Sequence, residues 1–427
     1  MPSLSASSRQ RLIPIVLAQV IGLACGVASV RLNSHLIPPA VLGVYGLFLT
    51  FTPLGMWLLY VGLLKYVNRQ WAASSNRAGL RREILSVGVR RLPWLALLTA
   101  GAAAAITGLS SVNHLIIWAA LFVSATLLTL AALAQTALQA EGAHWRDCLV
   151  GASGSITRSF TPPLLYIATG GVSAALWLGF SVHALVAALA GVWALRASFQ
   201  SPPTDPAVPP APRQVYEGPL FTALAIANLI LLGLNRWVVA WFFGEREAGY
   251  FTLAGGAVMI MTSMLTTVLV QYLQPGLFVL GDGSPADRRT LGRHVDLIAL
   301  FYTGAGLAGV GALTAVAPRL VGPLISEAYR DSLGWFFPAG CFGLAMSLGV
   351  FYHIMLIAGR RERACGPVDL TTGGILAAGC LLSAMGGVTW LSRWLMVTPL
   401  IPWLIARPMA RHYLFKPASG PAPAPDR

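Results

Sequence analysis

Twelve apolar runs, each about long enough to cross a lipid bilayer, follow one another along this 427-residue chain. A hydrocarbon core about 30 Å thick needs roughly 20 apolar residues in a helix. The pattern therefore predicts an all-α, polytopic membrane protein of about twelve transmembrane helices. The predicted spans cover residues 12–30, 40–64, 92–109, 115–138, 148–168 and 174–195 in the first half, and 219–243, 250–272, 297–316, 333–358, 370–385 and 390–406 in the second.

The composition excludes several other classes of protein. Only 10% of the residues are charged and 56% are hydrophobic, whereas a soluble domain has about 25% charged residues. The five cysteines are scattered singly and have no metal-ligand spacing with the seven histidines, so we expect neither a metal site nor a cofactor. The net charge is +14, but the basic residues lie between apolar runs and not on one face, which argues against nucleic acid as a partner.

The distribution of Lys and Arg predicts the orientation in the membrane. If the amino terminus is inside, 22 of the 29 basic residues fall in cytoplasmic segments and five fall in outside loops. Cytoplasmic loops retain basic residues. The chain is therefore predicted to cross the membrane with both termini in the cytoplasm.

A proline-rich segment divides the chain into two halves. Residues 198–213 contain six prolines, so this stretch cannot be a helix and is expected to connect the halves as a semi-extended linker. We predict an N-terminal lobe over residues 1–197, a C-terminal lobe over 214–407, and a disordered cytoplasmic tail over 408–427. The segments Leu42–Leu47 and Ala248–Leu253 echo each other at the start of the second span of each half, as a parallel repeat requires.

Arg158 is the outstanding candidate for a ligand-binding residue. It lies ten residues after the start of its predicted span, or about 15 Å deep. An arginine near the midplane costs about 2.5–3.5 kcal/mol on insertion scales, so it should face a wet cavity or an anionic partner. The alternative is that it snorkels, or that it bonds to carbonyls freed by Pro162 and Pro163 in the same helix.

Arg236 and Asn235 form a second candidate, in the outer half of the seventh span. They could bind a head group or hydrogen-bond to a neighbouring helix. Arg31 and Lys65, at the ends of the first two spans, could extend a basic path, although such residues often anchor a helix at the membrane interface.

Acidic residues are missing from the centres of the predicted spans. All fifteen fall in loops or near span ends, whereas cation-coupled exporters use a buried carboxylate. His183, His353 and Asp369 are the groups that could carry protons in a coupled cycle. For the two histidines, a hydrogen-bonded structural role is the preferred interpretation.

The residues that an enzyme would need are also missing. We find no nucleophile with its base and no large external loop, and the longest outside loop, 317–332, has 16 residues. The chain is therefore predicted not to be an enzyme. The open alternatives are a cation-coupled drug antiporter of the same architecture, a membrane-embedded glycan-modifying enzyme, and a scaffold for polysaccharide assembly.

The sequence resembles the oligosaccharide flippase family, the Wzx-like polysaccharide exporters, which are related to the multidrug and toxin extrusion transporters. In the first half the resemblance lies in Arg31, Pro39 and the segment Leu42–Leu47. In the second half it lies in Asn235-Arg236, Phe243-Gly244, Ala248-Gly249-Tyr250, Leu253-Ala254, Gln271 and Pro275. Many members carry an acidic residue where this chain has Asn235, so an ion pair that the family forms there is in doubt.

The resemblance implies two six-helix lobes around a cavity that opens alternately to each side. It implies a protein of the bacterial inner membrane whose cargo is an undecaprenyl-diphosphate-linked oligosaccharide. The cargo would be carried from the cytoplasmic to the periplasmic leaflet for O-antigen, capsule or exopolysaccharide synthesis. The partners would be membrane lipids and the polysaccharide polymerase and export machinery. The charge of the candidate ligands agrees with this cargo, because a diphosphate is an anion and arginines are cations.

Overall fold

The chain folds as an assembly of long helices. The computed structural model describes residues 6–73, 77–108, 113–196, 219–281, 284–359 and 361–416, and regular structure in this part of the chain is helical apart from one isolated bridge between Val321 and Ile325. The helices of the first half are α1 (Ala6–Leu36), α2 (Pro39–Ala73), α3 (Arg77–Thr107), α4 (His114–Ala140), α5 (His144–Ala168) and α6 (Ala174–Leu195). Those of the second half are α7 (Pro219–Gly281), α8 (Pro285–Leu320), η3 (Glu327–Ser332), α9 (Leu333–Ala358), α10 (Glu362–Met385), α11 (Val388–Val397), η4 (Pro402–Ala406) and α12 (Arg407–Phe415).

The fold class is as the sequence predicts, but the exact count of twelve spans stays a prediction. By length and composition, eight helices of the described residues could cross a membrane, and the bent pair formed by Val388–Val397 and Pro402–Phe415 would make a ninth. Two predicted spans, 219–243 and 250–272, lie in the single element α7. Gly244 interrupts that helix with a φ of 88°, a left-handed conformation that glycine adopts without the steric penalty of a Cβ.

Several helices extend well beyond the apolar runs, which corrects the predicted loops. The cytoplasmic loop expected over residues 65–91 is largely helical, because α2 continues to Ala73 and α3 begins at Arg77. Helix α8 begins twelve residues before its apolar run, at a capping box in which Ser284 and Asp287 bond to each other. The hydroxyl and backbone N–H of Ser284 donate to Asp287 and lower the pKa of its carboxyl group. Capping residues therefore set this helix end, and hydropathy does not.

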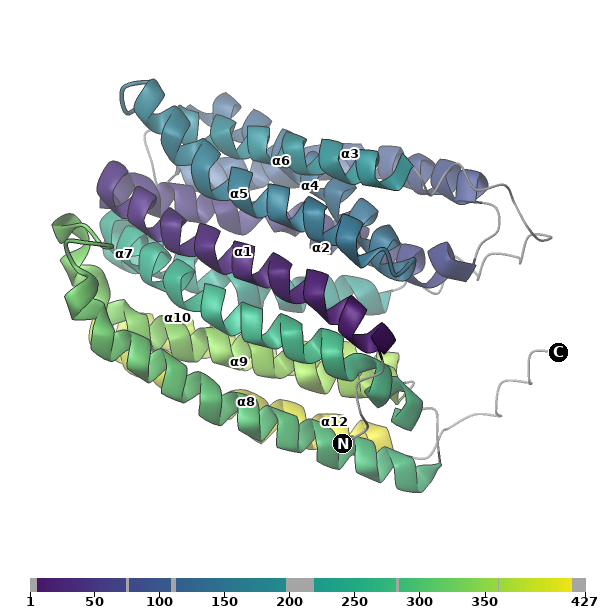
Figure 1. Ribbon diagram of the computed structural model, residues 1–427. Helices are drawn as coiled ribbons and strands as arrows, with labels where there is room; N and C mark the ends of the chain where they lie inside the picture. Colours follow the sequence, from purple (N-terminus) through teal and green to yellow (C-terminus); the bar gives the residue numbers. More distant parts are fainter. Residues whose placement is uncertain are drawn as a thin grey trace.

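The helices form two lobes with α1 and α7 at their boundary (Figure 1). Helices α3 to α6 lie on one side, α8, α9, α10 and α12 lie on the other, and α1 and α7 run side by side between them. A hydrophobic cluster that includes Phe48, Trp177, Phe251 and Trp335 crosses the boundary. A second cluster, around Trp71 and Leu95, belongs to the first half alone. The N-lobe below means α1–α6, and the C-lobe means α7–α12.

The lobes meet closely at the end that holds the α1–α2 connection. A Cβ atom at Gly43 would collide with the backbone carbonyl of Glu245, and one at Gly249 would collide with that of Pro39. The two echoing segments of the sequence therefore pack against each other, and each needs a glycine at the contact. We call this region the closed end.

Four hydrogen bonds also join the lobes at the closed end. The hydroxyl of Ser34 donates to the carbonyl of Leu324 and accepts from the N–H of Ser326, at 3.2 and 3.3 Å. The Tyr329 hydroxyl donates to the carbonyl of Ile37 at 2.8 Å, and a ring nitrogen of His35 lies 3.2 Å from the carbonyl of Gly322. The outside loop expected over residues 317–332 is thus the segment that holds the lobes together at this end.

The two ends of the described chain lie together at the opposite end of the molecule, which we call the terminal end (Figure 1).

The expected linker, 198–213, falls outside the described residues. The tail expected to be disordered from residue 408 needs correction, since residues 407–415 form α12 and bury Ala410 and Leu414. These small and apolar side chains pack onto the C-lobe, which a polar tail could not do. Residues 417–427 lie outside the described part.

Candidate functional site

Arg158 projects from α5 at a point where the helix is locally weakened. Pro162 and Pro163 lack the N–H groups that would bond to the carbonyls of Arg158 and Ser159, four residues earlier. Those carbonyls stay available as acceptors beside the guanidinium group. The Arg158 residue is exposed, not packed into the lobe. It lies ten residues before Ala168, the last residue of α5, or about 15 Å from that end.

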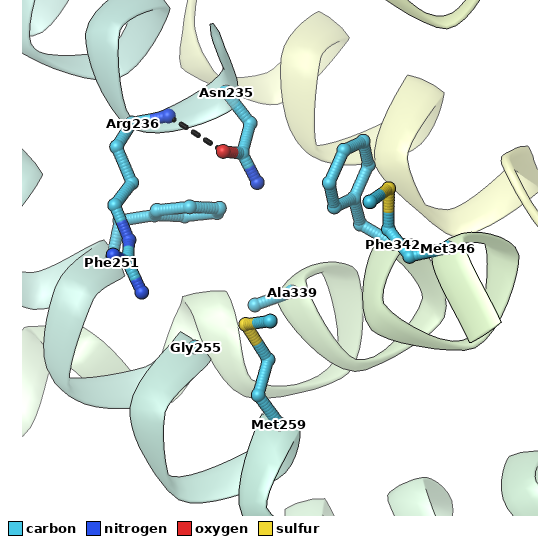
Figure 2. A pocket seen from close by; sticks show the side chains of 8 residues that line it. All are labelled: Asn235, Arg236, Phe251, Gly255, Met259, Ala339, Phe342 and Met346. Atoms are coloured by element: carbon cyan, nitrogen blue, oxygen red, sulfur yellow. Dashed lines mark hydrogen bonds between the residues drawn. The ribbon is translucent and has the colours of Figure 1, made fainter. Parts of the chain in front are cut away.

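Arg236 and Asn235 lie on the first part of α7 and line a pocket in the C-lobe (Figure 2). Asn235 is buried and Arg236 is half-buried. The side-chain oxygen of Asn235 accepts a hydrogen bond from the backbone N–H of Arg236 at 2.8 Å, which leaves the amide group of Asn235 directed into the pocket. The rest of the lining is apolar and includes Phe251, Met259, Ala339, Phe342 and Met346. The pocket thus combines one cation and one amide with flexible apolar walls.

The two arginines come from different lobes, and each lies within range of the other's charge. Arg158 lies close enough to Arg236 for their charges to repel each other, and its charge also acts on Tyr45 and His183. Arg236 lies eight residues before Gly244, or about 12 Å from that kink. The two guanidinium groups are therefore at similar depths below the closed end, and we call them the central arginine pair.

Neither member of the central arginine pair has an ion-pair partner among the described residues. Ion pairs in the described part include those of Arg146 with Glu141, Arg330 with Glu327, His353 with Asp369, and both Arg407 and Arg411 with Asp296. Two like charges that repel each other in the interior of a membrane protein are unfavourable without a counter-charge. An anion bound near both guanidinium groups would supply that counter-charge.

His183 occupies a buried position beside this site. It is 5% exposed, its Nδ1 lies 3.0 Å from the hydroxyl of Thr157, and its ring packs edge-on against Phe180. The first contact gives the Nδ1 atom a hydrogen-bond partner, and the second packs the imidazole ring against an aromatic side chain. They agree with the structural reading of His183, and a role in proton coupling stays a prediction.

His353 and Asp369, predicted separately, form a pair. The Nδ1 atom of His353 on α9 lies 3.0 Å from a carboxylate oxygen of Asp369 on α10. Their side chains are 22% and 14% exposed. Asp369 lies seven residues inside α10, and not at its start as the apolar run suggested, because the helix begins at Glu362. Sequence reasoning missed the pair because 16 residues and a helix connection separate its members.

The two weaker candidates, Arg31 and Lys65, belong to α1 and α2. Arg31 is exposed at the closed end, in the last part of α1. Lys65 belongs to α2, but its side chain lies outside the described residues. The basic path that these two residues could form stays a prediction.

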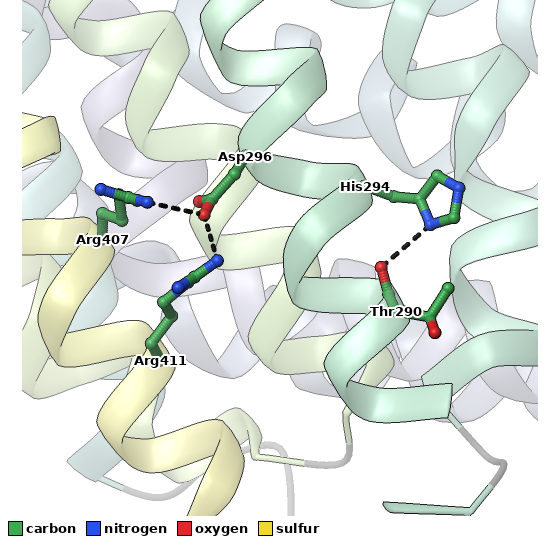
Figure 3. A network of polar contacts seen from close by, with 5 residues as sticks. All are labelled: Thr290, His294, Asp296, Arg407 and Arg411. Carbon is green, nitrogen blue, oxygen red and sulfur yellow. Dashed lines mark hydrogen bonds and ion pairs between the residues drawn. The ribbon is translucent and has the colours of Figure 1, made fainter. Parts of the chain in front are cut away.

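A third charged group was not singled out from the sequence (Figure 3). One carboxylate oxygen of Asp296 on α8 pairs with the guanidinium groups of both Arg407 and Arg411 on α12. The Arg407 contact measures 3.0 Å. Asp296 directly precedes the predicted span 297–316, whereas in the structure it lies eleven residues inside α8. The spacing of the two arginines, one helical turn apart, was the signal in the sequence.

Comparison with known proteins identifies the fold. No family model matches the chain, and no curated protein matches its sequence. Among solved structures it is similar to an inward-facing multidrug resistance MATE family transporter of the MOP superfamily, with a TM-score of 0.64, 15% identity, and coverage of 95% of this chain and 100% of the other.

Two further structures share the fold. The lipid II flippase MurJ in an inward closed conformation has a TM-score of 0.59 and 12% identity, over 94% of this chain and 87% of the other. A MOP superfamily transporter from Pyrococcus furiosus, reported with a binding pocket of reversed polarity, has a TM-score of 0.57 and 14% identity, over 94% and 95%. The chain thus has a fold found in both multidrug transporters and a lipid flippase. The Wzx-like family itself is not identified by these matches.

Proposed function

We propose that this protein is a flippase that moves an undecaprenyl-diphosphate-linked oligosaccharide across a bacterial inner membrane, from the cytoplasmic to the periplasmic leaflet. The product would serve the synthesis of a surface polysaccharide. The polymerase and export machinery of that pathway would be its partners.

The observation that carries this proposal is the central arginine pair. Arg158 and Arg236 project from different lobes, repel each other, and have no carboxylate partner among the described residues. A diphosphate supplies at least two negative charges and several acceptor oxygens, which match two guanidinium groups. Bound between the arginines, it would offset their repulsion and tie the two lobes to one ligand.

The polar groups beside the pair suit the rest of such a head group. Asn235 offers an amide, and the freed carbonyls of Arg158 and Ser159 offer acceptors, so sugar hydroxyls can find both kinds of partner. The undecaprenyl tail can stay in the bilayer while the head group crosses. The protein then has to shield only the sugar and the phosphates.

The closed end fits one state of an alternating cycle. If the basic residues set the orientation as predicted, the closed end faces the periplasm and the terminal end faces the cytoplasm. The lobes are then closed outside, as expected before cargo is released. Release would require the Gly43–Gly249 contact and the four inter-lobe hydrogen bonds to separate.

Translocation in proteoliposomes tests the proposal. A fluorescent undecaprenyl-diphosphate oligosaccharide is placed in the vesicles, and its arrival in the opposite leaflet is followed by a quencher that cannot cross. The parent chain should flip this lipid and should not flip the same oligosaccharide on an uncharged polyprenol. Flipping of both lipids at equal rates, or of neither, would contradict the proposal.

A second function is favoured by the His353–Asp369 pair. A titratable pair half-buried in one lobe can take up and release a proton, as a cation-coupled drug antiporter requires. The lining of the pocket beside Arg236 is apolar, but its volume is only about 10 Å³, so the pocket would have to widen before an amphipathic drug could bind there. The same fold occurs in a multidrug transporter.

Substitution of the pair separates the two functions. Asp369→Asn keeps the shape of the side chain and removes its charge. An antiporter would lose drug efflux driven by a pH gradient, whereas a flippase that runs downhill would keep its rate of lipid translocation. His353→Gln serves as the matching change on the partner side.

A further inference from the structure

An apolar pocket lies on the C-lobe where the last membrane segment is broken. Helix α11 ends at Val397 and the chain resumes at Pro402 with a bend of 44°. The break leaves a pocket against α8, lined by Leu300, Thr303 and Leu307 on one side and by Met396, Leu400 and Trp403 on the other.

Two residues of the pocket lining are largely exposed, Leu300 to 61% and Leu400 to 56%. In Figure 1, α8 and α12 lie on the side of the C-lobe away from the N-lobe. The pocket therefore opens to the surrounding lipid and not to the central arginine pair.

The pocket leads directly to the charged cluster at the terminal end. The indole N–H of Trp403 donates to the hydroxyl of Thr303 at 3.2 Å, which fixes the ring between the two walls. The guanidinium group of Arg407 lies over this ring, 5.4 Å from its centroid. The apolar pocket, the indole ring and the guanidinium group therefore follow one another in space. This order suits a molecule with an apolar tail and a charged head.

The cluster itself has an excess positive charge. Arg407 and Arg411 share the single carboxylate of Asp296, so one of the two charges has no counterpart within the cluster (Figure 3). The side chains of both arginines are 39% exposed, whereas that of Asp296 is 11% exposed. The exposed face of the cluster therefore consists of guanidinium groups. Arg293, also exposed and three residues before Asp296, adds to the positive field.

The distances along α8 match one leaflet of a bilayer. Leu307 lies eleven residues after Asp296, or about 16 Å along the helix axis. One leaflet of the hydrocarbon core is about 15 Å thick. A lipid with its phosphate beside Arg407 and Arg411 would place one chain along the whole pocket.

From these features we propose that the C-lobe binds a negatively charged phospholipid at the terminal end, with one acyl chain in the pocket between α8 and Leu400 and its phosphate on Arg407 and Arg411. The lipid supplies the missing negative charge and fills the gap left by the broken span. It would thereby hold α12 against α8. The site is separate from the central arginine pair and does not depend on the cargo.

Native mass spectrometry of the full chain in detergent tests the site, with dioleoylphosphatidylglycerol and dioleoylphosphatidylcholine as the added lipids. The parent should bind the anionic lipid about 10-fold more tightly, because the choline cation of phosphatidylcholine neutralises the charge of its phosphate and phosphatidylglycerol has no such cation. The double change Arg407→Gln with Arg411→Gln should abolish this preference. Arg393→Gln, at an exposed arginine in the middle of α11, is the matched control and should retain it.

Two further variants keep the test decisive if the double variant fails to fold. Asp296→Asn frees both guanidinium groups, so the anionic lipid should bind about 3- to 10-fold more tightly. Leu400→Trp fills the pocket without changing charge and should weaken the binding of both lipids. Weaker binding of the anionic lipid by Asp296→Asn, or parent-like binding by Leu400→Trp, would overturn the proposal. So would a double variant that keeps the parent preference.

Discussion

Two regions of this molecule each bring two guanidinium groups together, and they differ in what balances the charge. At the terminal end, Arg407 and Arg411 share the carboxylate of Asp296, and the contact joins α12 to α8 within one lobe. Between the lobes, Arg158 and Arg236 act on each other without a carboxylate partner among the described residues. A pair that already has one carboxylate can join two helices before any ligand binds, although one of its two charges stays available to a lipid. A pair without one gains its counter-ion only when an anion binds, so it is suited to carry cargo.

The largest expected effect comes from removing the exposed member of the central arginine pair. Arg158→Ala should lower the rate of lipid-linked oligosaccharide flipping about 100-fold, because a charge-assisted hydrogen bond to phosphate contributes about 1.5–3 kcal/mol. Arg158→Lys should restore part of the rate, since it keeps the charge but not the bidentate geometry. Initial rates in proteoliposomes measure both. Arg196→Ala, an exposed arginine at the end of α6, is the control, and an equal loss there would show that net charge alone matters.

Removal of the half-buried member should have a smaller effect. Arg236→Ala is expected to slow flipping about 10-fold, because the apolar walls of its pocket remain and Arg158 still binds the anion. Arg393→Ala provides a matched change elsewhere in the C-lobe. A rate equal to that of the parent would remove Arg236 from the site.

A carboxylate introduced beside the central arginine pair should give it a counter-ion, like the one that Arg407 and Arg411 have in Asp296. Asn235→Asp places a negative charge next to Arg236 in a buried position, so the site would lose part of its attraction for an anion. We expect an affinity about 5- to 10-fold lower for the diphosphate lipid, measured by quenching of a labelled lipid in detergent. Asn235→Ala controls for loss of the amide. Tighter binding by the aspartate variant would contradict the role of uncompensated charge.

The converse change at the terminal end should affect stability more than transport. Asp296→Asn removes the shared carboxylate and leaves two arginines that repel each other. Since both are more than a third exposed to solvent, the expected loss is only about 1 kcal/mol in the free energy of unfolding. Thermal unfolding in an uncharged detergent measures this loss, and the flipping rate per folded molecule should stay close to that of the parent. A large loss of transport would mean that the cluster takes part in the cycle.

The sequence predicts the helices better than their ends. Hydropathy identifies the membrane segment, but α8 begins at the Ser284–Asp287 capping box, twelve residues earlier than its apolar run. In the same way, the polar but helix-forming stretch before residue 92 belongs to α3. These extensions carry Asp296 well inside α8, so its side chain can face α12. An apolar count alone cannot place such a residue.

The candidate site is predictable only in part, for a similar reason. The cost of an arginine within a membrane span points to Arg158 and Arg236 separately. Their approach to each other depends on how two lobes pack, and no local pattern records that. The members of the His353–Asp369 pair are 16 residues apart in the sequence, and those of the Asp296–Arg407 pair are 111 residues apart. These contacts therefore also follow from tertiary packing. The glycines at positions 43 and 249 could be recognised as a motif, but their reason, a close approach of two backbones, needs the fold.

The most direct test of the account is whether the two central arginines bind the same anion. A double-mutant cycle would measure the affinity of a labelled undecaprenyl-diphosphate oligosaccharide for the parent, Arg158→Ala, Arg236→Ala and the double variant. If one diphosphate bridges both guanidinium groups, the second substitution should cost much less once the first is made, with a coupling of about 1 kcal/mol or more. If the two losses simply add, the arginines bind separate groups or none, and the central claim is wrong.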